Sequence, residues 1–563
     1  MFVMTLVVFM PAARAQNKIL FDAMKDELAR SMNELKLENA PAPYYISYMV
    51  NDSYNLRIGA DSGAIVINSE SHGRLLRVDV HVGDYARDNY NFRPGGNQPA
   101  HPRGIPLNID DDYDALRRQI WQETDHAYKT AVDTLNRKTA ALRDVAPTDR
   151  PADFSKGGAT ASVVKANDFD VSREMWAERV NSITGMLPRD RNIERSIIDL
   201  QIRVANTLYV NSEGAETLDP SSITRLTIIL SGRAEDGSPV ENYRVYTTAR
   251  AEELPDLKTL ETDIQALATG FNAMRTAPIG EEYSGPVLFE GEAAGELFAQ
   301  GFVNFLKGIR TPETDVPQLT ALLNQSANPF INRINTKVAA NFLSIKAVPS
   351  MKRYGQKELA GAYATDSEGF PARDVSLVEN GILKTLLMSR APIKGIDVSN
   401  GHGRGTTVIP SVIHVISENK KPYDQLKQNL IDAVRDEGLA YGYIICGLIP
   451  SDIAASSAIQ TLLGQRQSDP GQFRLSKPYS IFRLYADGRE EQVRGLEIGV
   501  VNANALRNVL AASEDETAHI YPAGGAGNAA TIITPSLLIN GIDLKKSAII
   551  YPKPPVVDSP IRD

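Results

Sequence analysis

The chain has 563 residues, with 60 Lys and Arg against 69 Asp and Glu, so its formal net charge is −9. Apolar residues make up 42% and charged residues 23%, a globular composition that excludes wholesale disorder. The acidic balance argues against nucleic acid as the partner. The single cysteine, Cys446, excludes an internal disulfide framework and zinc sites built from several cysteines.

The first fifteen residues have the pattern of a secretory signal peptide. An apolar run at 2–10 leads through Pro11 to Ala13-Arg14-Ala15, a small-x-small cleavage signal. The run is shorter than the roughly 20 residues of a membrane span. We therefore expect a signal peptide at 1–15, no membrane span, and an exported protein in the periplasm or outside the cell. A ragged hydrophobic N-terminus is the alternative.

The chain up to about residue 280 mixes long helices with strands. Apolar residues spaced by three and four predict helices at 21–35, 113–135 and 257–271, the second opened by the acidic run Asp110-Asp111-Asp112. Strands are predicted within 43–84 and 196–248, and a polar loop near 144–170. The length and these changes of pattern predict an N-terminal α+β domain at 16–280.

Beyond a boundary near 277–286 the pattern becomes richer in strands. Asn380-Gly381 and Asp487-Gly488 both predict two-residue hairpin turns, in which both turn positions need a positive φ. One amphipathic helix is predicted at 422–437, with Gly438 as its C-terminal stop. We expect an α+β fold overall, with a β-rich C-terminal domain at 281–550 followed by a tail at 551–563.

Common catalytic motifs are missing from the sequence. None of the seven histidines is followed by Glu, so no His-Glu-x-x-His helix exists. Neither a Gly-x-Ser-x-Gly elbow nor a phosphate-binding Gly-rich loop occurs. Cys446 lies in the apolar run 443–448, which favours an inert buried thiol over a nucleophile, because a nucleophilic cysteine needs a lowered pKa.

The segment at 284–309 carries the most information about chemistry. A buried strand at 287–289 runs into a helix that opens at Glu290-Gly291-Glu292. Glu292 and Glu296 are four residues apart and so share one helix face, an arrangement that can hold a metal. The alternative is a solvated acidic helix face, since acidic residues also suit a helix N-terminus.

Several motifs in order resemble the TldD/PmbA family, known as TldD/TldE metallopeptidases and as modulators of DNA gyrase. The resemblance covers about 280–545 and is only general in 17–275. The matching motifs are Ser284-Gly285-Pro286-Val287-Leu288-Phe289-Glu290, Thr365-Asp366-Ser367-Glu368-Gly369, Leu377-Val378-Glu379-Asn380-Gly381, Ser399-Asn400-Gly401-His402-Gly403-Arg404 and Pro535-Ser536-Leu537-Leu538-Ile539.

The resemblance implies a substituted zinc site. Active members of the family use His-Glu-x-x-x-His on the central helix and a C-terminal cysteine as zinc ligands. Here the two histidine positions are occupied by Gly291 and Glu296 and the cysteine position by Ala523, while Glu292 keeps the catalytic glutamate. Cys446 is too early in the chain to replace that ligand. A catalytic zinc needs three protein donors, so we expect no metal or other cofactor in this chain.

Three functions are compatible with these residues. The first is a TldE-like, non-catalytic subunit of a peptidase that degrades unfolded or short peptides, dimeric with a zinc-bearing TldD-like paralogue or with itself. The second is an active hydrolase in which Glu290, Glu292 and Glu296 hold a hard cation, with help from His402 or His414. The third is a non-enzymatic peptide-binding protein of the cell envelope. Whether the chain is an enzyme stays open in the sequence.

Overall fold

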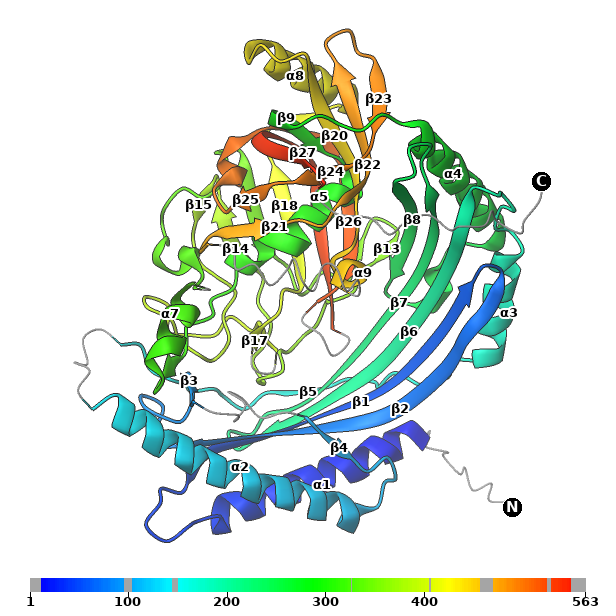
Figure 1. Ribbon diagram of the computed structural model, residues 1–563. Helices are drawn as coiled ribbons and strands as arrows, with labels where there is room; N and C mark the ends of the chain where they lie inside the picture. The colour runs from blue at the N-terminus through cyan, green and yellow to red at the C-terminus, as the bar shows by residue number, and fades with distance from the viewer. Residues whose placement is uncertain are drawn as a thin grey trace, which may run out of the picture.

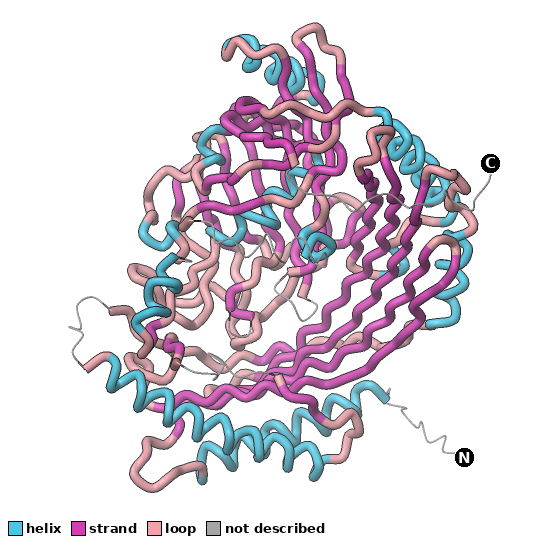
Figure 2. The backbone as a smooth tube through the Cα atoms, viewed as in Figure 1, coloured by secondary structure: helices cyan, strands magenta, loops and turns pink. Residues whose placement is uncertain are grey.

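The computed structural model describes residues 12–95, 104–143, 150–325, 327–404, 407–455, 469–523 and 528–547. Two sheets organise them, one built from the N-terminal half and one from the C-terminal half (Figures 1 and 2). The α+β fold predicted from the sequence is confirmed. Most of the predicted signal peptide and all of the tail at 551–563 lie outside the described residues, so both stay predictions, as do the domain boundaries.

The N-terminal sheet has seven strands in the order β4-β2-β1-β6-β7-β5, with β8 also paired to β7. Its four central strands are long and antiparallel, as the predicted strand regions required. Their bounds are β1 (Pro43–Asp61), β2 (Ala64–Val82), β4 (Ile105–Leu107), β5 (Ala161–Val163), β6 (Ile193–Asn211), β7 (Glu216–Arg233) and β8 (Pro239–Thr248).

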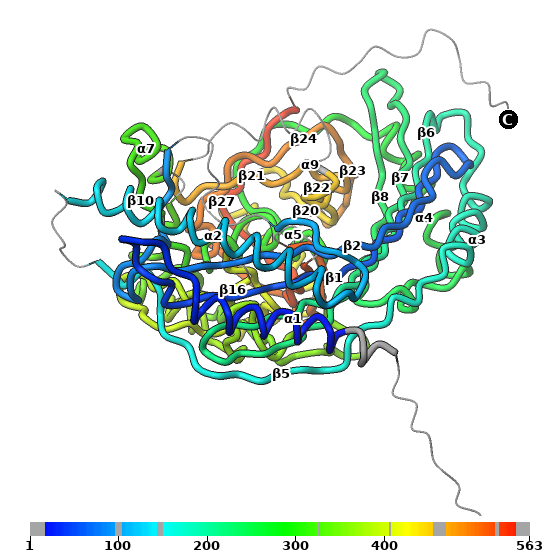
Figure 3. Tube along the Cα trace, turned by 90° about the horizontal axis from the view of Figure 1, so that it is seen from below, coloured from blue at the N-terminus to red at the C-terminus, as the bar shows by residue number. Residues whose placement is uncertain are grey.

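Four helices cover the outer face of this sheet (Figures 1 and 3). They are α1 (Ala12–Glu34), α2 (Tyr113–Ala141), α3 (Arg173–Thr184) and α4 (Leu257–Thr276). Asp112 and Asp256 cap α2 and α4 by accepting backbone N–H bonds. The sequence analysis missed α3, whose buried apolar positions are few. Within the described ranges, no helix is both long and apolar enough to cross a membrane.

Strand alternation decides which residues face the second half of the chain. Tyr48 and Val50 on β1 pack in the core beneath α1 and α2. Their neighbours Tyr45, Ser47 and Met49 therefore point to the opposite, inner face, where they line a pocket. The inner face of the N-terminal sheet is turned toward the C-terminal sheet (Figure 1).

The C-terminal sheet has twelve strands, and β9 lies between β20 and β27 at its centre. Helix α8 (Tyr423–Asp436) packs against one face, and the helical segment after β9 packs against the other. The strands are β9 (Tyr283–Phe289), β11 (Leu343–Ala347), β14 (Val375–Glu379), β15 (Ile382–Leu383), β18 (Val412–Ser417), β19 (Lys420–Lys421), β20 (Tyr441–Leu448), β22 (Pro478–Tyr485), β23 (Glu490–Val493), β24 (Leu496–Ile498), β26 (Val509–Pro522) and β27 (Ala529–Lys546).

Shorter elements connect these strands. The helical ones are α5 (Gly291–Leu297), a π-helical turn (Phe298–Phe302), α6 (Val303–Phe305), α7 (Pro317–Gln325), α9 (Ser451–Ala455) and the single turns Ala251–Glu253, Pro329–Asn332 and Ala505–Asn508. Four two-stranded ladders complete the fold: β3 (Phe92–Arg93) with β10 (Glu313–Thr314), β12 (Arg353–Tyr354) with β13 (Lys357–Glu358), β16 (Gly403–Arg404) with β17 (Thr407–Val408), and β21 (Gln472–Arg474) with β25 (Val500–Asn502).

The two predicted hairpin turns have different outcomes. Asn380 and Gly381 have φ of 46° and 78°, so the predicted turn between β14 and β15 is confirmed. Between β22 and β23 only Gly488 has a positive φ, 86°, and Tyr485 N–H donates to the Arg489 carbonyl. The hairpin predicted at Asp487-Gly488 is therefore confirmed, but its two-residue turn is not, because this longer loop needs only one left-handed residue. Gly438, with φ of 68°, ends α8 as predicted.

The buried guanidinium of Arg390 joins the two halves of the chain. It donates to the Ser155 carbonyl at 2.7 and 3.0 Å and lies 2.8 Å from a carboxylate oxygen of Glu213. Its carbon lies 4.0 Å from the ring centre of Phe154 and 4.8 Å from that of Tyr45. The side chain is fully buried, so each of these contacts stabilises a charge removed from water.

Two carboxyl groups lie directly behind Arg390. Asp366 accepts backbone N–H bonds from Glu368, Phe370 and Gly403, and Glu368 accepts the Arg390 N–H at 2.7 Å. Burial raises the pKa of both groups, and the charge of Asp366 raises the pKa of Glu368 further. Glu368 therefore holds its proton into the neutral range, at the contact between the two halves.

We expect Arg390→Met to lower the free energy of unfolding by about 3–5 kcal/mol, because it leaves Glu213 and the Ser155 carbonyl without their cation. Urea unfolding of the full chain measures this. Arg173→Met is the matched control, since Arg173 is 40% exposed in its ion pair with Glu70 and should change stability by under about 1 kcal/mol. Equal losses of unfolding free energy in the two variants would show that Arg390 does not stabilise the contact between the two halves.

Stability should fall as the pH rises from about 4.5 to about 8, because the pKa of Glu368 rises from 4.5 to about 8 on folding. In that range the folded state binds more protons than the unfolded state. Glu368→Gln keeps the shape of the side chain and removes its ionisation. The loss of unfolding free energy across this pH window should therefore shrink by roughly 1–3 kcal/mol. Melting temperatures of both proteins across pH 4–9 test it, and an unchanged slope would contradict it.

Candidate functional site

The site begins where β9 turns into α5. Phe289 is the last residue of the buried strand, and Gly291 opens the helix with φ of 44°, a left-handed conformation that favours glycine. The Gly291 N–H donates to Ser536 Oγ at 3.0 Å, which fixes the turn to β27. This turn aims the next helical residues at the space between the two sheets.

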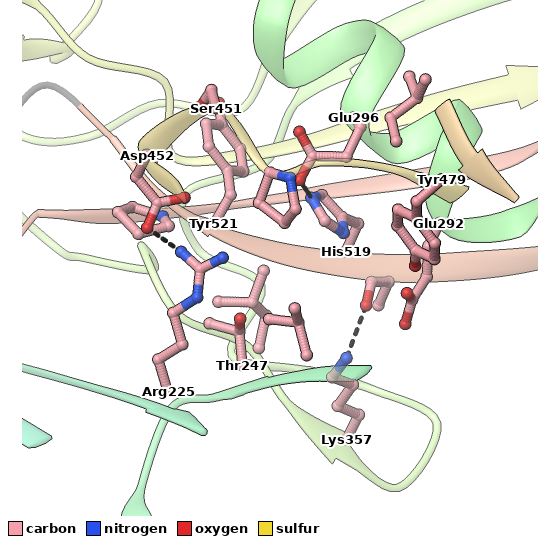
Figure 4. Close-up of a pocket in the computed structure, with 16 residues that line it drawn as sticks. Arg225, Thr247, Glu292, Glu296, Lys357, Ser451, Asp452, Tyr479, His519 and Tyr521 are labelled. Atoms are coloured by element: carbon pink, nitrogen blue, oxygen red, sulfur yellow. Dashed lines mark hydrogen bonds and ion pairs between the residues drawn. The ribbon is translucent and has the colours of Figure 1, made fainter. Parts of the chain in front are cut away.

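Glu292 and Glu296 follow one turn apart on α5, and both line a pocket (Figure 4). The pocket spans about 600 Å³, part of it open solvent. Glu292 is exposed, whereas Glu296 is 4% exposed. The alternative of a solvated acidic face is therefore wrong for Glu296, because the helix buries that position against β26.

Glu296 is held by two neighbours. Gln300 Nε2 donates to one carboxylate oxygen at 2.7 Å, and His519 Nε2 on β26 lies 3.1 Å from the other. The histidine contact has ion-pair distance without the alignment of a hydrogen bond. Gln300 is itself fixed, because its amide also bonds the Ile449 carbonyl and Ser476. The carboxylate of Glu296 is thus part of a rigid polar wall.

Charged groups from both halves of the chain complete the pocket (Figure 4). Arg225 on β7 forms an ion pair with Asp452 on α9. Lys357 on β13 donates to the Ala518 carbonyl at 2.7 Å, and burial lowers the pKa of its ammonium although Glu292 opposes this. The pocket therefore presents cations and anions around one opening.

Two tyrosines add hydroxyl groups to the wall. Tyr479 on β22 and Tyr521 on β26 both line the pocket, and burial raises the pKa of both phenols. The Tyr521 hydroxyl has no hydrogen-bond partner among the described residues. Both groups stay protonated near neutral pH and can donate to a ligand.

Sequence reasoning placed Glu292 and Glu296 on one helix face, as the structure has them, and missed His519. The Cβ position of Gly295 lies 2.5 Å from His519 Cβ, so only glycine lets the helix approach β26 this closely. Alternation on β26 puts His519 and Tyr521 on the same face. That alternation is visible in the sequence, but the contact with α5 is not, because more than 200 residues separate them.

The other candidate histidines lie elsewhere. His414 on β18 bonds Glu516 at 2.8 Å, and it is in register with Ile533, which pairs with Ala518. His519 follows Ala518 and so faces the other side of the sheet. His402 is buried, with Nδ1 3.0 Å from Asn400 Oδ1, and burial lowers its pKa to about 4. Neither histidine lines the pocket, so the structure does not bring them to the carboxylates.

Glu290 and Cys446 also lie outside this pocket. Burial and the neighbouring Glu290 raise the pKa of the Cys446 thiol well above its ordinary value. Cys446 is half-buried against α8. A raised pKa disfavours the thiolate that a nucleophile needs, in line with the prediction of an inert thiol.

The residues at the family's ligand positions do not fit a catalytic zinc. Gly291 has no side chain, Ala523 offers a buried methyl group, and Glu296 is engaged by Gln300 and His519. Within the part of the chain that the structure describes, no three His, Cys, Asp or Glu side chains are placed to hold a metal. Glu292 alone keeps its position, without the donor set that would surround it.

Comparisons with known proteins find a family match in the C-terminal half of the chain. Residues 282–546 match the PmbA/TldA metallopeptidase C-terminal domain. A metalloprotease of Methanothermobacter thermautotrophicus is 25% identical over 247 residues, which is 43% of this chain; the matched part spans about half (48%) of that relative's length.

Solved structures share the fold. A Thermotoga maritima protein solved as a candidate modulator of DNA gyrase superposes with a TM-score of 0.61 and 13% identity, over 93% of this chain and 100% of that one. TldE of Thermococcus kodakarensis gives 0.59 and 15%, over 93% and 99%. The predicted resemblance is confirmed: the chain has a PmbA/TldA-type C-terminal domain within the fold of TldE and its structural relatives.

Proposed function

We propose that this chain is a peptide-binding, non-catalytic subunit of a TldD/TldE-type peptidase. The observation that carries the proposal is the wall around Glu296, where relatives with the zinc motif have histidine and cysteine ligands. Two of the three donor positions hold Gly291 and Ala523. The third position holds Glu296, whose carboxylate is engaged by Gln300 and His519. A lone Glu292 cannot lower the pKa of water as a bound metal does.

Features of the pocket favour a peptide as the ligand. Strand β8 pairs only with β7 among the described strands, and its residues Val245 and Thr247 line the pocket. An edge strand can pair with an extended peptide through backbone hydrogen bonds. Lys357 and Arg225 around the opening can meet the carboxylate end and polar side chains of such a peptide.

The partner we propose is a zinc-bearing paralogue with an intact His-Glu-x-x-x-His helix, or a second copy of this chain. Structures solved as TldE and as a candidate gyrase modulator share the fold over more than nine-tenths of this chain. A subunit without zinc-ligating residues would contribute pocket walls and peptide contacts. The paralogue would supply the metal and the hydrolytic step.

We expect the purified full chain to bind a fluorescein-labelled unstructured peptide without cleaving it, with and without added Zn²⁺. Adding the co-expressed zinc-bearing paralogue should give hydrolysis that exceeds that of the paralogue alone. Anisotropy measures binding, mass spectrometry measures cleavage, and size-exclusion chromatography with light scattering measures assembly.

Glu292→Gln separates this proposal from an enzyme with a rebuilt carboxylate metal site. In a non-catalytic subunit the variant should leave the hydrolysis rate of the assembly within about twofold, as should the surface control Glu282→Gln. Stoichiometric metal in the isolated chain, with peptidase activity lost in Glu292→Gln alone, would refute the proposal. A stable homodimer that retains peptides would instead favour an envelope peptide-binding protein.

We also propose that the protein is exported, on the signal-like pattern at 1–15. Expression of the full reading frame in a Gram-negative host should yield protein that is released by osmotic shock and begins at Gln16. N-terminal sequencing of the released protein measures this. An intact Met1 on protein that stays with the cytoplasmic fraction would show that the segment is no export signal.

A further inference from the structure

Arg203 on β6 is a half-buried cation on the inner face of the N-terminal sheet (Figure 1 shows β6 between β1 and β7). Its guanidinium donates to the side-chain amide oxygens of Asn55 at 2.8 Å and Asn51 at 3.1 Å. Its Nε is buried without a hydrogen-bond partner among the described residues. Burial lowers the pKa of Arg203, and no nearby acidic group opposes this effect.

Other arginines on the same face are neutralised. Arg57 lies 2.8 Å from Asp199, Arg77 lies 2.9 Å from Asp79, and Arg225 is paired with Asp452. Arg203 forms no ion pair with any carboxylate of the described residues, and its two partners are uncharged amides. A half-buried cation without a counter-charge keeps part of its desolvation cost, so an anionic ligand at this position would stabilise it.

Strand register places Arg203 near the pocket, although Arg203 itself does not line it. Arg225, which lines the pocket, pairs with Gln201, two residues before Arg203 on β6 and on the same face. The direct partner of Arg203 on β7 is Ile223, which packs in one cluster with Ile520 of the pocket wall. Two residues of strand correspond to about 7 Å. The guanidinium is bonded to β1, on the side of β6 opposite β7, so an extended ligand must also cross β6 to reach it.

We propose that Arg203 binds a carboxylate of the peptide held in the pocket, so that the site selects peptides with a C-terminal carboxylate or an acidic side chain near the bound segment. This inference rests on the proposed peptide-binding function. Arginine suits this role because its planar fork can donate two hydrogen bonds to one carboxylate. Asn51 and Asn55 hold the guanidinium in place before the ligand arrives.

Three fluorescein-labelled peptides of one neutral sequence test the proposal on the full chain: the free acid, its C-terminal amide, and the amide with one internal Glu. At least one carboxylate-bearing peptide should bind about tenfold tighter than the neutral amide. In Arg203→Gln the carboxylate-bearing peptides should lose their extra affinity, while the neutral amide should bind as it does to the wild type. Arg203→Lys should keep part of the preference for a carboxylate. The free acid and the internal Glu distinguish the two sources of carboxylate.

Arg57→Gln is the matched control, because Arg57 lies on the same face and is paired with Asp199. It should leave the carboxylate preference within about twofold, and melting curves should confirm that both variants are folded. A preference that survives in Arg203→Gln, or equal binding of all three peptides to the wild type, would overturn the role of Arg203. Absence of binding of any peptide to the wild type would instead overturn the proposed peptide-binding function.

Discussion

The burial of Arg390 between the two halves of the chain is the constraint on which the rest of the structure depends. A guanidinium in that position needs a carboxylate, carbonyl groups and aromatic faces at the same time, and the N-terminal half supplies all of them through Glu213, Ser155, Phe154 and Tyr45. These requirements leave little freedom for the two sheets to slide past each other. The relative placement of the sheets then decides where every side chain of the inner face can reach.

The candidate site is a product of this placement. Arg225 belongs to the N-terminal sheet, whereas Glu296 and His519 belong to the C-terminal one, and neither half could form the pocket alone. A second, smaller pocket near Glu368 lies on the same inner face. On this inner face, Arg203 forms no ion pair with a carboxylate of the described residues.

The residues at the family's ligand positions have structural roles in this chain. Gly291 takes the left-handed turn into α5, Ala523 is buried, and Glu296 is bonded to Gln300. A carboxylate that has such partners is stabilised as part of a wall, whereas a zinc ligand must direct its lone pairs to a common centre. The geometry therefore supports the proposal that these residues form a rigid binding surface and hold no metal.

The sequence by itself determined the local structure: the helices α1, α2, α4, α5 and α8, the long strands, the Asn380-Gly381 turn and the pairing of Glu292 with Glu296 on one helix face. These features depend on residues close together in the chain, whose spacing and conformational preferences are visible directly. Only the tertiary structure decided that Glu296 is buried against His519 and that Arg203 lacks a counter-charge. Such facts depend on contacts between residues far apart in sequence, and no local pattern records which strand will lie opposite which helix.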